Sequence, residues 1–306
     1  MKRPGSPPPL DRSSRRARRR PVTRAGLLRA LKEKVGTRAL LLVMAAFFLM
    51  PLYWMTITAL KSPAELSQFP PTLWPRDPQW RNFVDAVTFI PFGRYFLNTV
   101  VIAVLGTIGT TLSSFLVAYG FSRLRWPGRD IVFVTVLASI FIFVRFPVNP
   151  ITMVPLFVLF AKMGWVNTFL PLIVPTFFGN PFYIFLLRQF LLQIPREISD
   201  AARIDGANEF QIMRRIVLPL TKPALAVVAI FAAFMLWNDF LGPLIYLQDQ
   251  DRYTLSVGLS FYQGTHDTEW HLLMAASTLV VLPQLAIFFF FFQRYFLEGI
   301  TLGSVK

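Results

Sequence analysis

The sequence predicts an all-α membrane protein with six membrane-spanning helices. Its 306 residues are 54% hydrophobic and only 15% charged, whereas soluble domains carry about 25% charged residues. Six apolar segments, most of them as long as the roughly 20 residues that a helix needs to cross a bilayer, alternate with polar intervals. The chain has no cysteine, which excludes disulfides and thiolate metal sites. It also lacks the G-x-x-x-x-G-K-[ST] phosphate loop, so no cofactor is expected in this chain.

The amino-terminal segment holds most of the net charge. Residues 1–38 contain 13 Lys and Arg against Asp11 and Glu33, and therefore carry +11 of the total +15. We expect 1–22, rich in Pro, Arg and Ser, to be disordered, and 24–38 to form a short amphipathic helix on the membrane surface. The chain is thus divided into a basic tail with its surface helix, 1–38, and a six-span domain, 39–306. Such a tail favours anionic lipid over nucleic acid as its partner.

The apolar segments are taken in chain order. In the second, Gly106, Thr110 and Ser113 recur at helical spacing, which favours close packing against another helix. The third and fourth are joined by 147–167, which we expect to be an irregular, proline-broken return. The fourth is interrupted by prolines around Asn180, and such breaks survive only where protein or a cavity satisfies the freed backbone groups. The expected spans are Ala39–Ala59, Leu97–Phe121, Ile131–Phe146, Phe169–Leu192, Ala224–Leu247 and Leu272–Phe296.

The distribution of basic residues predicts the orientation of these spans. A cytoplasmic amino terminus and six spans put three basic groups on the same side: the amino-terminal tail, the three arginines of the 122–130 connector and the basic residues of 188–222. Because basic loops stay on the cytoplasmic side, we expect both termini in the cytoplasm. The intervals 61–96 and 254–269 are then expected outside, as loops without a predicted helix.

The longest polar interval of the carboxy-terminal half is 195–220, PREISDAARIDGANEFQIMRRIVLPL. It reads as two short helices joined at Gly206, which supplies the backbone freedom of a sharp turn. Pro195 suits the first turn of the first helix, and Asn208 can cap the second, along which Phe210, Met213 and Val217 recur at helical spacing. We expect Pro219 to end that second helix. A polar helix–turn–helix between spans is suited to docking a soluble partner.

The residues of this interval carry a family resemblance. Asp200-Ala201-Ala202, three residues, Gly206, nine residues and then Ile216-x-Leu218-Pro219 resemble the "EAA" loop of ATP-binding-cassette importer permeases, with Asp200 where the family usually has Glu. The resemblance implies that 195–220 is the cytoplasmic coupling helix–turn–helix that sits in a groove of the ATPase subunit. The small side chains of Ala201 and Ala202 would allow close approach. Residues expected to couple to the ATPase are Asp200, Ala201, Ala202, Asp205, Gly206, Ile216, Leu218 and Pro219.

Further segments resemble the permeases of the carbohydrate-uptake class, the family that includes the smaller membrane subunit of the maltose importer. They include the 123–129 connector, the 164–168 segment GWVNT and the closing 293–306 segment. The resemblance implies an importer permease fold of type I in a bacterial plasma (inner) membrane. It also implies a heterodimer with a second homologous permease, two ATPase subunits that bind ATP and Mg, an extracytoplasmic solute-binding protein and a sugar substrate. The chain itself would be non-catalytic.

Polar residues inside apolar spans are candidates for contact with a substrate. Trp237-Asn238-Asp239 interrupts the predicted fifth span, and a carboxylate at that depth usually faces a cavity or a partner. A Trp ring beside amide and carboxylate groups suits a sugar. The alternative is that Trp237 is an interface anchor and that Asp239 pairs with an arginine of a neighbouring chain. Asn180 is a weaker candidate, because its side chain is placed to satisfy the break at Pro181.

Three other functions remain open on the sequence. The same type of importer could carry glycerol phosphate or another small solute, although no cation is evident in the middle of a span. A secondary transporter would often show inverted repeats, and none is detected by eye. A membrane-anchored scaffold or nucleic-acid-binding protein would depend on residues 1–22.

Overall fold

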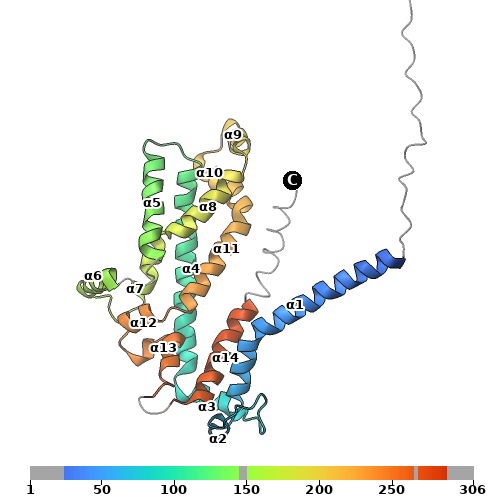
Figure 1. Cartoon of the computed structure of the whole chain (residues 1–306). Coiled ribbons are helices and arrows are strands. Elements are labelled where there is room, and N and C mark those ends of the chain that lie inside the picture. Colours follow the sequence, from blue (N-terminus) through green and yellow to red (C-terminus); the bar gives the residue numbers. More distant parts are fainter. Residues whose placement is uncertain (1–23, 145–149, 265–267, 288–306) are drawn as a thin grey trace, which may run out of the picture. The chain divides into compact units, whose positions relative to one another are not determined.

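The computed structural model describes residues 24–144, 150–264 and 268–287, which are almost entirely helical (Figure 1). The described residues contain no strand beyond an isolated bridge between Gln263 and Thr268. The chain divides into two compact units, Met1–Tyr53 and Trp54–Lys306. The predicted disordered tail, 1–22, and the closing motif, 293–306, lie outside the described residues.

The first long helix, α1, spans Arg24–Ala59 without interruption. A surface helix ending at residue 38 is therefore wrong, because the helix continues directly into the predicted first span. Nothing around Arg38 breaks a helix, and Gly36 lies within it. The apolar side chains from Leu40 to Val43 are exposed, as expected of a segment whose solvent is lipid.

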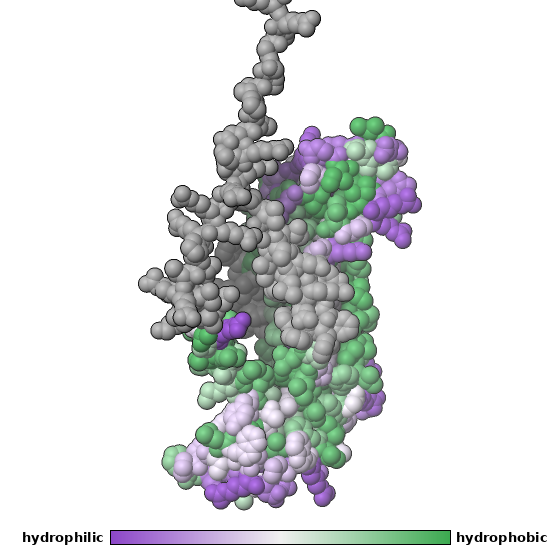
Figure 2. All heavy atoms as spheres, turned by 90° about the vertical axis from the view of Figure 1, so that its right-hand side faces the viewer, coloured by the Kyte–Doolittle hydropathy of each residue, from purple (hydrophilic) through white to green (hydrophobic). Residues whose placement is uncertain are grey.

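Four helices of the second unit lie side by side around one core (Figure 1). They are α4 (Phe92–Ser122), α5 (Arg129–Val144), α8 (Pro181–Gln193) and α11 (Leu218–Trp237). Their shared core contains Tyr119, Leu187, Leu191 and Val228, of which the last three are fully or almost fully buried. In Figure 2 hydrophobic residues predominate around the middle of the second unit and hydrophilic residues gather at its two ends.

Helix α4 packs closely against the fourth segment at Ser113, which belongs to the predicted small-residue stripe, and at Gly109, which does not. The fourth segment consists of α7 (Leu170–Ile173), the 3₁₀ turn η2 (Val174–Phe178) and α8. A Cβ added to Gly109 would lie 2.5 Å from Thr176 Oγ1 and 2.6 Å from Phe177 Cδ2. The Ser113 hydroxyl donates to the carbonyl of Thr176 at 3.2 Å. Glycine at 109 thus leaves room for the side chains of Thr176 and Phe177 against the backbone of α4.

The break in the fourth segment falls where the sequence places it. Asn180 is the N-cap of α8, and its Oδ1 accepts hydrogen bonds from the backbone N–H groups of Phe182 and Tyr183 at 3.0 and 3.4 Å. The backbone N–H of Asn180 donates to Ser114 Oγ at 3.1 Å. The freed backbone groups are thus satisfied by protein, as such a break requires.

The described part of 147–167 is helical rather than irregular, which corrects that expectation. Helix α6 spans Pro150–Lys162 with Pro155 inside it. Pro155 removes one backbone hydrogen bond, but aromatic packing of the helix compensates: Phe160 contacts Trp165 and Tyr246, with ring centroids 5.6 and 5.4 Å apart. Tertiary packing has overridden the local effect of the proline.

The GWVNT segment that follows α6 forms a tight turn. Gly164 and Asn167 have φ values of +69° and +62°. Asn167 Oδ1 accepts from the backbone N–H groups of Gln248 and Asp249, each at 3.0 Å, and its own N–H donates to the carbonyl of Tyr246 at 2.7 Å. Asn167 therefore holds the segment after α12 (Leu241–Tyr246) in place.

The two intervals expected to be loops contain short helices. Residues 61–96 include α2 (Pro63–Leu66) and α3 (Arg81–Phe89), and 254–269 includes α13 (Leu255–Ser260). Glu65 is buried, and its carboxylate accepts from the Thr72 hydroxyl at 2.7 Å and from the backbone N–H of Arg76. These hydrogen bonds hold the stretch between α2 and α3 against Glu65. A further 3₁₀ turn, η4, covers Gln250–Arg252.

Within the described residues, four helical segments are long and apolar enough to cross a membrane: Val35–Ala59, Phe92–Ser122, Leu170–Gln193 and Glu209–Trp237. They correspond to the first, second, fourth and fifth predicted spans. The third and sixth predicted spans contain α5 and α14 (Trp270–Ile287), which run up to the edge of the described residues. The six-span count is therefore taken up below as a proposal.

Candidate functional site

The polar interval 195–220 forms the predicted pair of short helices at one end of α4, α8 and α11 (Figure 1). Helix α9 (Arg196–Ile204) follows Pro195, and its Ser199 and Ala202 face the core. Asp200 and Ala201 are exposed on the other side. Of the two alanines, only Ala201 is therefore available for close approach by a partner, since Ala202 packs inside the chain.

The turn between the helices requires glycine for its backbone. Gly206 has a φ of +84°, and a Cβ added there would meet nothing within 4 Å. L-residues with a side chain disfavour this left-handed backbone conformation even where the side chain has free space. Asp205 is the C-cap of α9, and the N–H of Gly206 donates to the carbonyl of Arg203 at 3.0 Å. The predicted sharp turn is confirmed.

The second helix begins with a complete capping box. Asn208 Oδ1 accepts from the N–H of Gln211 at 2.9 Å, and Gln211 Oε1 accepts from the N–H of Asn208 at 3.0 Å. Helix α10 (Glu209–Ile212) starts in the register that this cap sets. Ile212 is consequently buried, whereas Phe210, which was expected on the apolar face, is 63% exposed.

Pro219 does not end the second helix, contrary to expectation. A π-helical turn, η3 (Met213–Val217), joins α10 to α11, in which Pro219 occupies the first turn. The N–H of Leu218 donates to the carbonyl of Met213, five residues back. The wider turn leaves room for a residue that lacks an N–H. Of the remaining motif residues, Ile216 and Leu218 are half-buried beside the core.

An ion-pair network fastens the turn to the core helices. Arg203 donates from Nε to Glu209 Oε1 at 2.7 Å and from Nη1 to Asp200 Oδ1, so it bridges α9 and α10. The Tyr119 hydroxyl at the end of α4 donates to Glu209 Oε2 at 3.0 Å. The hydrogen bond to Glu209, with the nearby carboxylates, raises the pKa of Arg203. Asp200, the motif carboxylate, thus has an internal partner.

A second arginine ties the end of α4 to the end of α8, just before the loop. Arg123 Nη2 donates to the carbonyls of Leu191 and Ile194, each at 2.8 Å, and satisfies the carboxy-terminal end of that helix. Burial lowers the pKa of Arg123. Sequence analysis assigned Tyr119, Arg123 and Glu209 no role at the site. Tyr119 and Glu209 are 90 residues apart in sequence, and no local pattern indicates that they meet.

The outer surface of the loop is apolar at its tip. Ile204 is 87% exposed and Ile198 is 40% exposed, on the same short helix, and Phe210 adds a third large apolar side chain. Exposed apolar groups gathered on a rigid support are typical of a protein-interaction site. The arrangement can therefore bind a soluble partner through Ile204 and Phe210 while Arg203 and Glu209 hold the two helices together.

The Trp237-Asn238-Asp239 run lies at a helix end rather than inside a span, which corrects the predicted fifth segment. Helix α11 ends at Trp237, and Asn238 Nδ2 donates to the carbonyl of Phe234 at 2.8 Å. Asp239 Oδ1 accepts from the N–H of Gly242 at 3.2 Å and so supports α12. Trp237 is buried against Phe96, with ring centroids 5.8 Å apart. The Asn238 and Asp239 side chains thus bond to backbone groups at a break, and non-helical backbone is tolerated where such groups are satisfied.

Asn180 lines a separate pocket of about 310 Å³ between α4, the fourth segment and α11. The pocket walls are mostly apolar and include Tyr183, Met235 and Leu236, with the Thr110 and Thr176 side chains as polar members. None of Trp237, Asn238 and Asp239 lines it. The structure therefore brings Asn180 to a cavity and leaves the other three substrate candidates at the neighbouring helix end.

Comparison with known proteins bears on the role of this arrangement. The family model described as "Binding-protein-dependent transport system inner membrane component" matches residues 109–301, which include the whole 195–220 loop. The chain belongs to this family. Its members are permease subunits of transport systems, and the match supports the resemblance that the loop motif indicated.

Several relatives match nearly the full length of this permease. The arabinooligosaccharides transport system permease protein of Bacillus subtilis is 33% identical over 278 residues, covering 89% of this chain and 96% of the relative. The trehalose/maltose transport system permease protein of Thermococcus litoralis is 32% identical over 292 residues, covering 90% and 99%. The diacetylchitobiose uptake system permease protein of Streptomyces coelicolor is 32% identical over 274 residues, covering 88% of each chain.

A solved structure shows the same fold. A chain from the crystal structure of a bacterial ABC transporter involved in the import of the acidic polysaccharide alginate superposes with a TM-score of 0.70 at 22% identity. The match covers 87% of this permease and 96% of that chain. The helical arrangement described here is therefore that of an ABC importer permease.

Proposed function

We propose that this permease is one of two related membrane subunits of an ATP-driven importer for a di- or oligosaccharide. The relatives named above transport oligosaccharides or disaccharides by their names, and the alginate transporter was also crystallised with a periplasmic protein bound to an alginate pentasaccharide. A solute-binding protein outside the bacterial inner membrane, a second permease and two ATPase subunits complete the assembly. ATP hydrolysis belongs to the ATPase subunits.

The observation that carries this proposal is the construction of the 195–220 loop. Its apolar tip, with Ile204 and Phe210, projects from the end of the helices and is available to a partner. Arg203, Glu209 and Tyr119 fasten the same loop to α4. A loop that is exposed to a partner and rigidly tied to the spans transmits movement in both directions. We assign it to coupling with the ATPase, in the cytoplasm.

The proposed membrane topology has six spans, with α1, α4, α5, the fourth segment, α11 and α14 each belonging to one. Both termini and the 195–220 loop then share the cytoplasmic side, and 61–96 and 254–269 face outward. Residues 1–38 form the basic approach to the first span, and 39–306 form the permease domain. The arginines around residues 123–129 and 188–222 support this orientation.

The pocket beside Asn180 is the proposed part of the solute pathway within this subunit. Its mostly apolar walls with a few polar groups suit a sugar, whose C–H faces pack on Tyr183 while its hydroxyls bond to polar side chains. Trp237, Asn238 and Asp239 support the adjoining break and thereby position the end of α11. The absence of arginine and lysine from the lining favours a neutral sugar over a phosphorylated solute.

Affinity purification of the full chain from native membranes, with mass identification of what accompanies it, tests this assignment. We expect a second permease, an ATPase subunit and a solute-binding protein, and the ligand of the binding protein then names the substrate. As a matched comparison, Ile204→Glu should release the ATPase while the second permease remains bound. A chain that purifies alone and transports without ATP would contradict the proposal and indicate a secondary transporter.

A further inference from the structure

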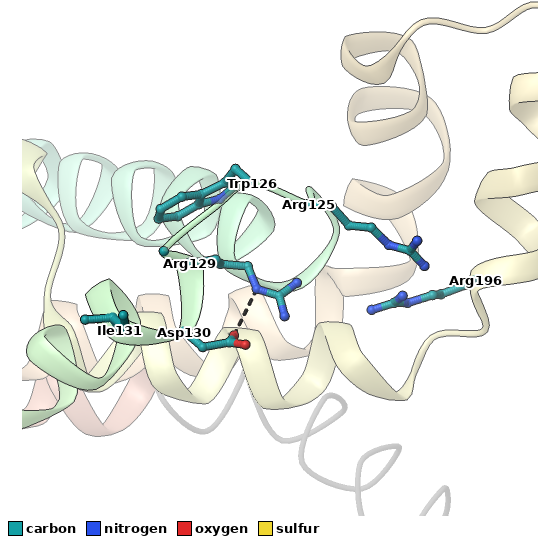
Figure 3. Close-up of a pocket in the computed structure, with 7 residues that line it drawn as sticks. Arg125, Trp126, Arg129, Asp130, Ile131 and Arg196 are labelled. Carbon is teal, nitrogen blue, oxygen red and sulfur yellow. Dashed lines mark hydrogen bonds and ion pairs between the residues drawn. The ribbon is translucent and has the colours of Figure 1, made fainter.

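A pocket of about 370 Å³ lies beside the loop but outside the coupling motif (Figure 3). It is formed by the connector between α4 and α5, by the first turn of α5 and by the first residue of α9. Its charged members are Arg125, Arg129, Arg196 and Asp130. Two segments that are distant in sequence, 125–131 and the start of α9, thus bring three arginines and one carboxylate to the same hollow.

The charges in this pocket are not balanced within the described chain. Arg129 Nε pairs with Asp130 Oδ1 at 3.0 Å. Arg125 and Arg196 form no ion pair with any residue that the structure describes, and their guanidinium groups point toward one another from opposite walls (Figure 3). Two cations that converge repel each other, and an anion between them would remove that repulsion. Guanidinium groups are well suited to bind phosphate oxygens through paired hydrogen bonds.

One wall of the pocket continues into an apolar surface. Ile131 lines the pocket and is 76% exposed, and Val134, one turn further along α5, is 62% exposed. The Trp126 ring stands at the rim. Trp is enriched where a membrane meets water. A free anion needs only the arginines, whereas this pocket also offers a path for an acyl chain along α5.

The neighbouring cavity, of about 430 Å³, provides a contrast. It shares Arg125 and Arg196 but also contains Asp200 and Glu209, the two carboxylates that pair with Arg203. The two carboxylates oppose an anion there, and Asp200 belongs to the motif proposed to couple to the ATPase. The pocket at Trp126 and Ile131 contains Asp130 as its one carboxylate and includes an exposed apolar residue of α5. Its charge and its apolar wall both favour a lipid over an acidic protein segment.

We propose that Arg125 and Arg196 bind the phosphate of an anionic phospholipid, whose acyl chains lie along the exposed apolar side of α5. The ion pair with Asp130 holds Arg129 at the edge of the site. The bound headgroup would connect α9 of the coupling loop to the α4–α5 connector through Arg196 and Arg125. This proposal rests on the proposed function only in placing this end of the helices at a membrane surface.

Native mass spectrometry of the purified importer, titrated with phosphatidylglycerol and with phosphatidylcholine of the same chain length, tests the proposal. Each basic residue near a lipid surface contributes about fivefold to binding. We therefore expect R125Q and R196Q each to weaken phosphatidylglycerol binding about fivefold, and D130N to strengthen it. Arg81 provides the matched control, since its exposed side chain lies on α3 at the other end of the molecule (Figure 1). R81Q should leave phosphatidylglycerol binding unchanged.

Three outcomes would overturn the proposal. Equal binding of the two lipids, or equal loss in R81Q and R125Q, would show no specific site. Displacement of phosphatidylglycerol by an equal concentration of inorganic phosphate would indicate a free-anion site. Loss of the ATPase from R125Q and R196Q with lipid binding intact would assign the arginines to an acidic protein surface. Lipid binding is read separately from subunit composition, so failure here is distinguishable from failure of the importer assignment.

Discussion

Substitutions at Gly206 test the coupling loop through its backbone alone. Gly206 has a φ of +84° with nothing within 4 Å of an added Cβ, so the whole effect of a side chain is conformational. The left-handed conformation costs an L-residue about 1–2 kcal/mol. Asn is the residue that tolerates it best, Ala pays that cost, and a β-branched residue exceeds it. Strain of about 2 kcal/mol shifts a two-state equilibrium roughly 30-fold.

The assay measures ATP hydrolysis and sugar uptake in the same proteoliposomes containing the whole importer. We expect uptake, and the ATP hydrolysis that the loaded binding protein stimulates, to fall least in Gly206→Asn, further in Gly206→Ala and most in Gly206→Val. The strained turn would separate α9 from α10 and break the Arg203–Glu209 pair that bridges them. Hydrolysis that is no longer stimulated by substrate would identify the variant as uncoupled rather than unfolded.

Gly164 supplies the matched control for this series. It has a similar φ of +69° and equally open surroundings, but it lies in the turn after α6 and outside the coupling loop. Gly164→Val therefore introduces comparable strain, and we expect it to lower stability while the ratio of uptake to hydrolysis stays normal. If Gly206→Val supported normal stimulated hydrolysis, or if both valine variants changed that ratio alike, the reasoning would be refuted.

Three further predictions follow from contacts within the second unit. Gly109→Ala should destabilise the purified complex by about 1–3 kcal/mol through overpacking. Gly120→Ala in the same helix, where an added Cβ meets nothing within 4 Å, should stabilise it by up to about 1 kcal/mol. A similar change in melting temperature for both variants would contradict the close approach at Gly109. Tyr119→Phe removes one hydrogen bond and should lower stability by about 1 kcal/mol. Glu209→Gln should reduce coupled uptake more than Tyr119→Phe does, because it also weakens the bond to Arg203. Equal uptake in the two variants would show that the ion-pair network does not contribute to coupling. Asn167→Ala removes two accepted hydrogen bonds and should cost about 1–3 kcal/mol, and an unchanged melting temperature would count against its clamping role.

The features of the site that sequence predicts are those set by neighbouring residues. Gly206 and Asn208 each obey a local rule, one of backbone freedom and one of helix capping, so the turn and the start of the second helix follow from the sequence. The break at Asn180 is likewise local, because an N-cap residue directly precedes a proline. These predictions needed no knowledge of the fold.

The features that sequence missed depend on tertiary contact or on an unusual helix geometry. Glu209 meets Tyr119 from 90 residues away, and no periodicity connects them. Pro219 reads as a helix stop unless the preceding turn is known to be π-helical. Phe210 shares the helical spacing of the buried Val217 but is exposed, and Ile212 is buried in the register that begins at the capping box. The first of these features depends on a contact between residues distant in sequence, and the other two depend on the detailed helix geometry of the loop.

The continuity of the helix after Gly206 has a consequence for coupling. From Glu209 to Trp237 the backbone is helical for 29 residues, a length of about 43 Å at 1.5 Å per residue. One end carries Glu209 of the coupling network, and the other brings Met235 and Leu236 to the pocket beside Asn180. No loop interrupts this path, so a displacement imposed at the coupling loop reaches the pocket along a continuous helix. The π turn lies next to the loop, and Pro223 lies inside α11. A coupled two-state change requires that the partner contact the two states differently. We therefore expect a partner bound at the loop to move α11 about η3 and so to shift the pocket between two states.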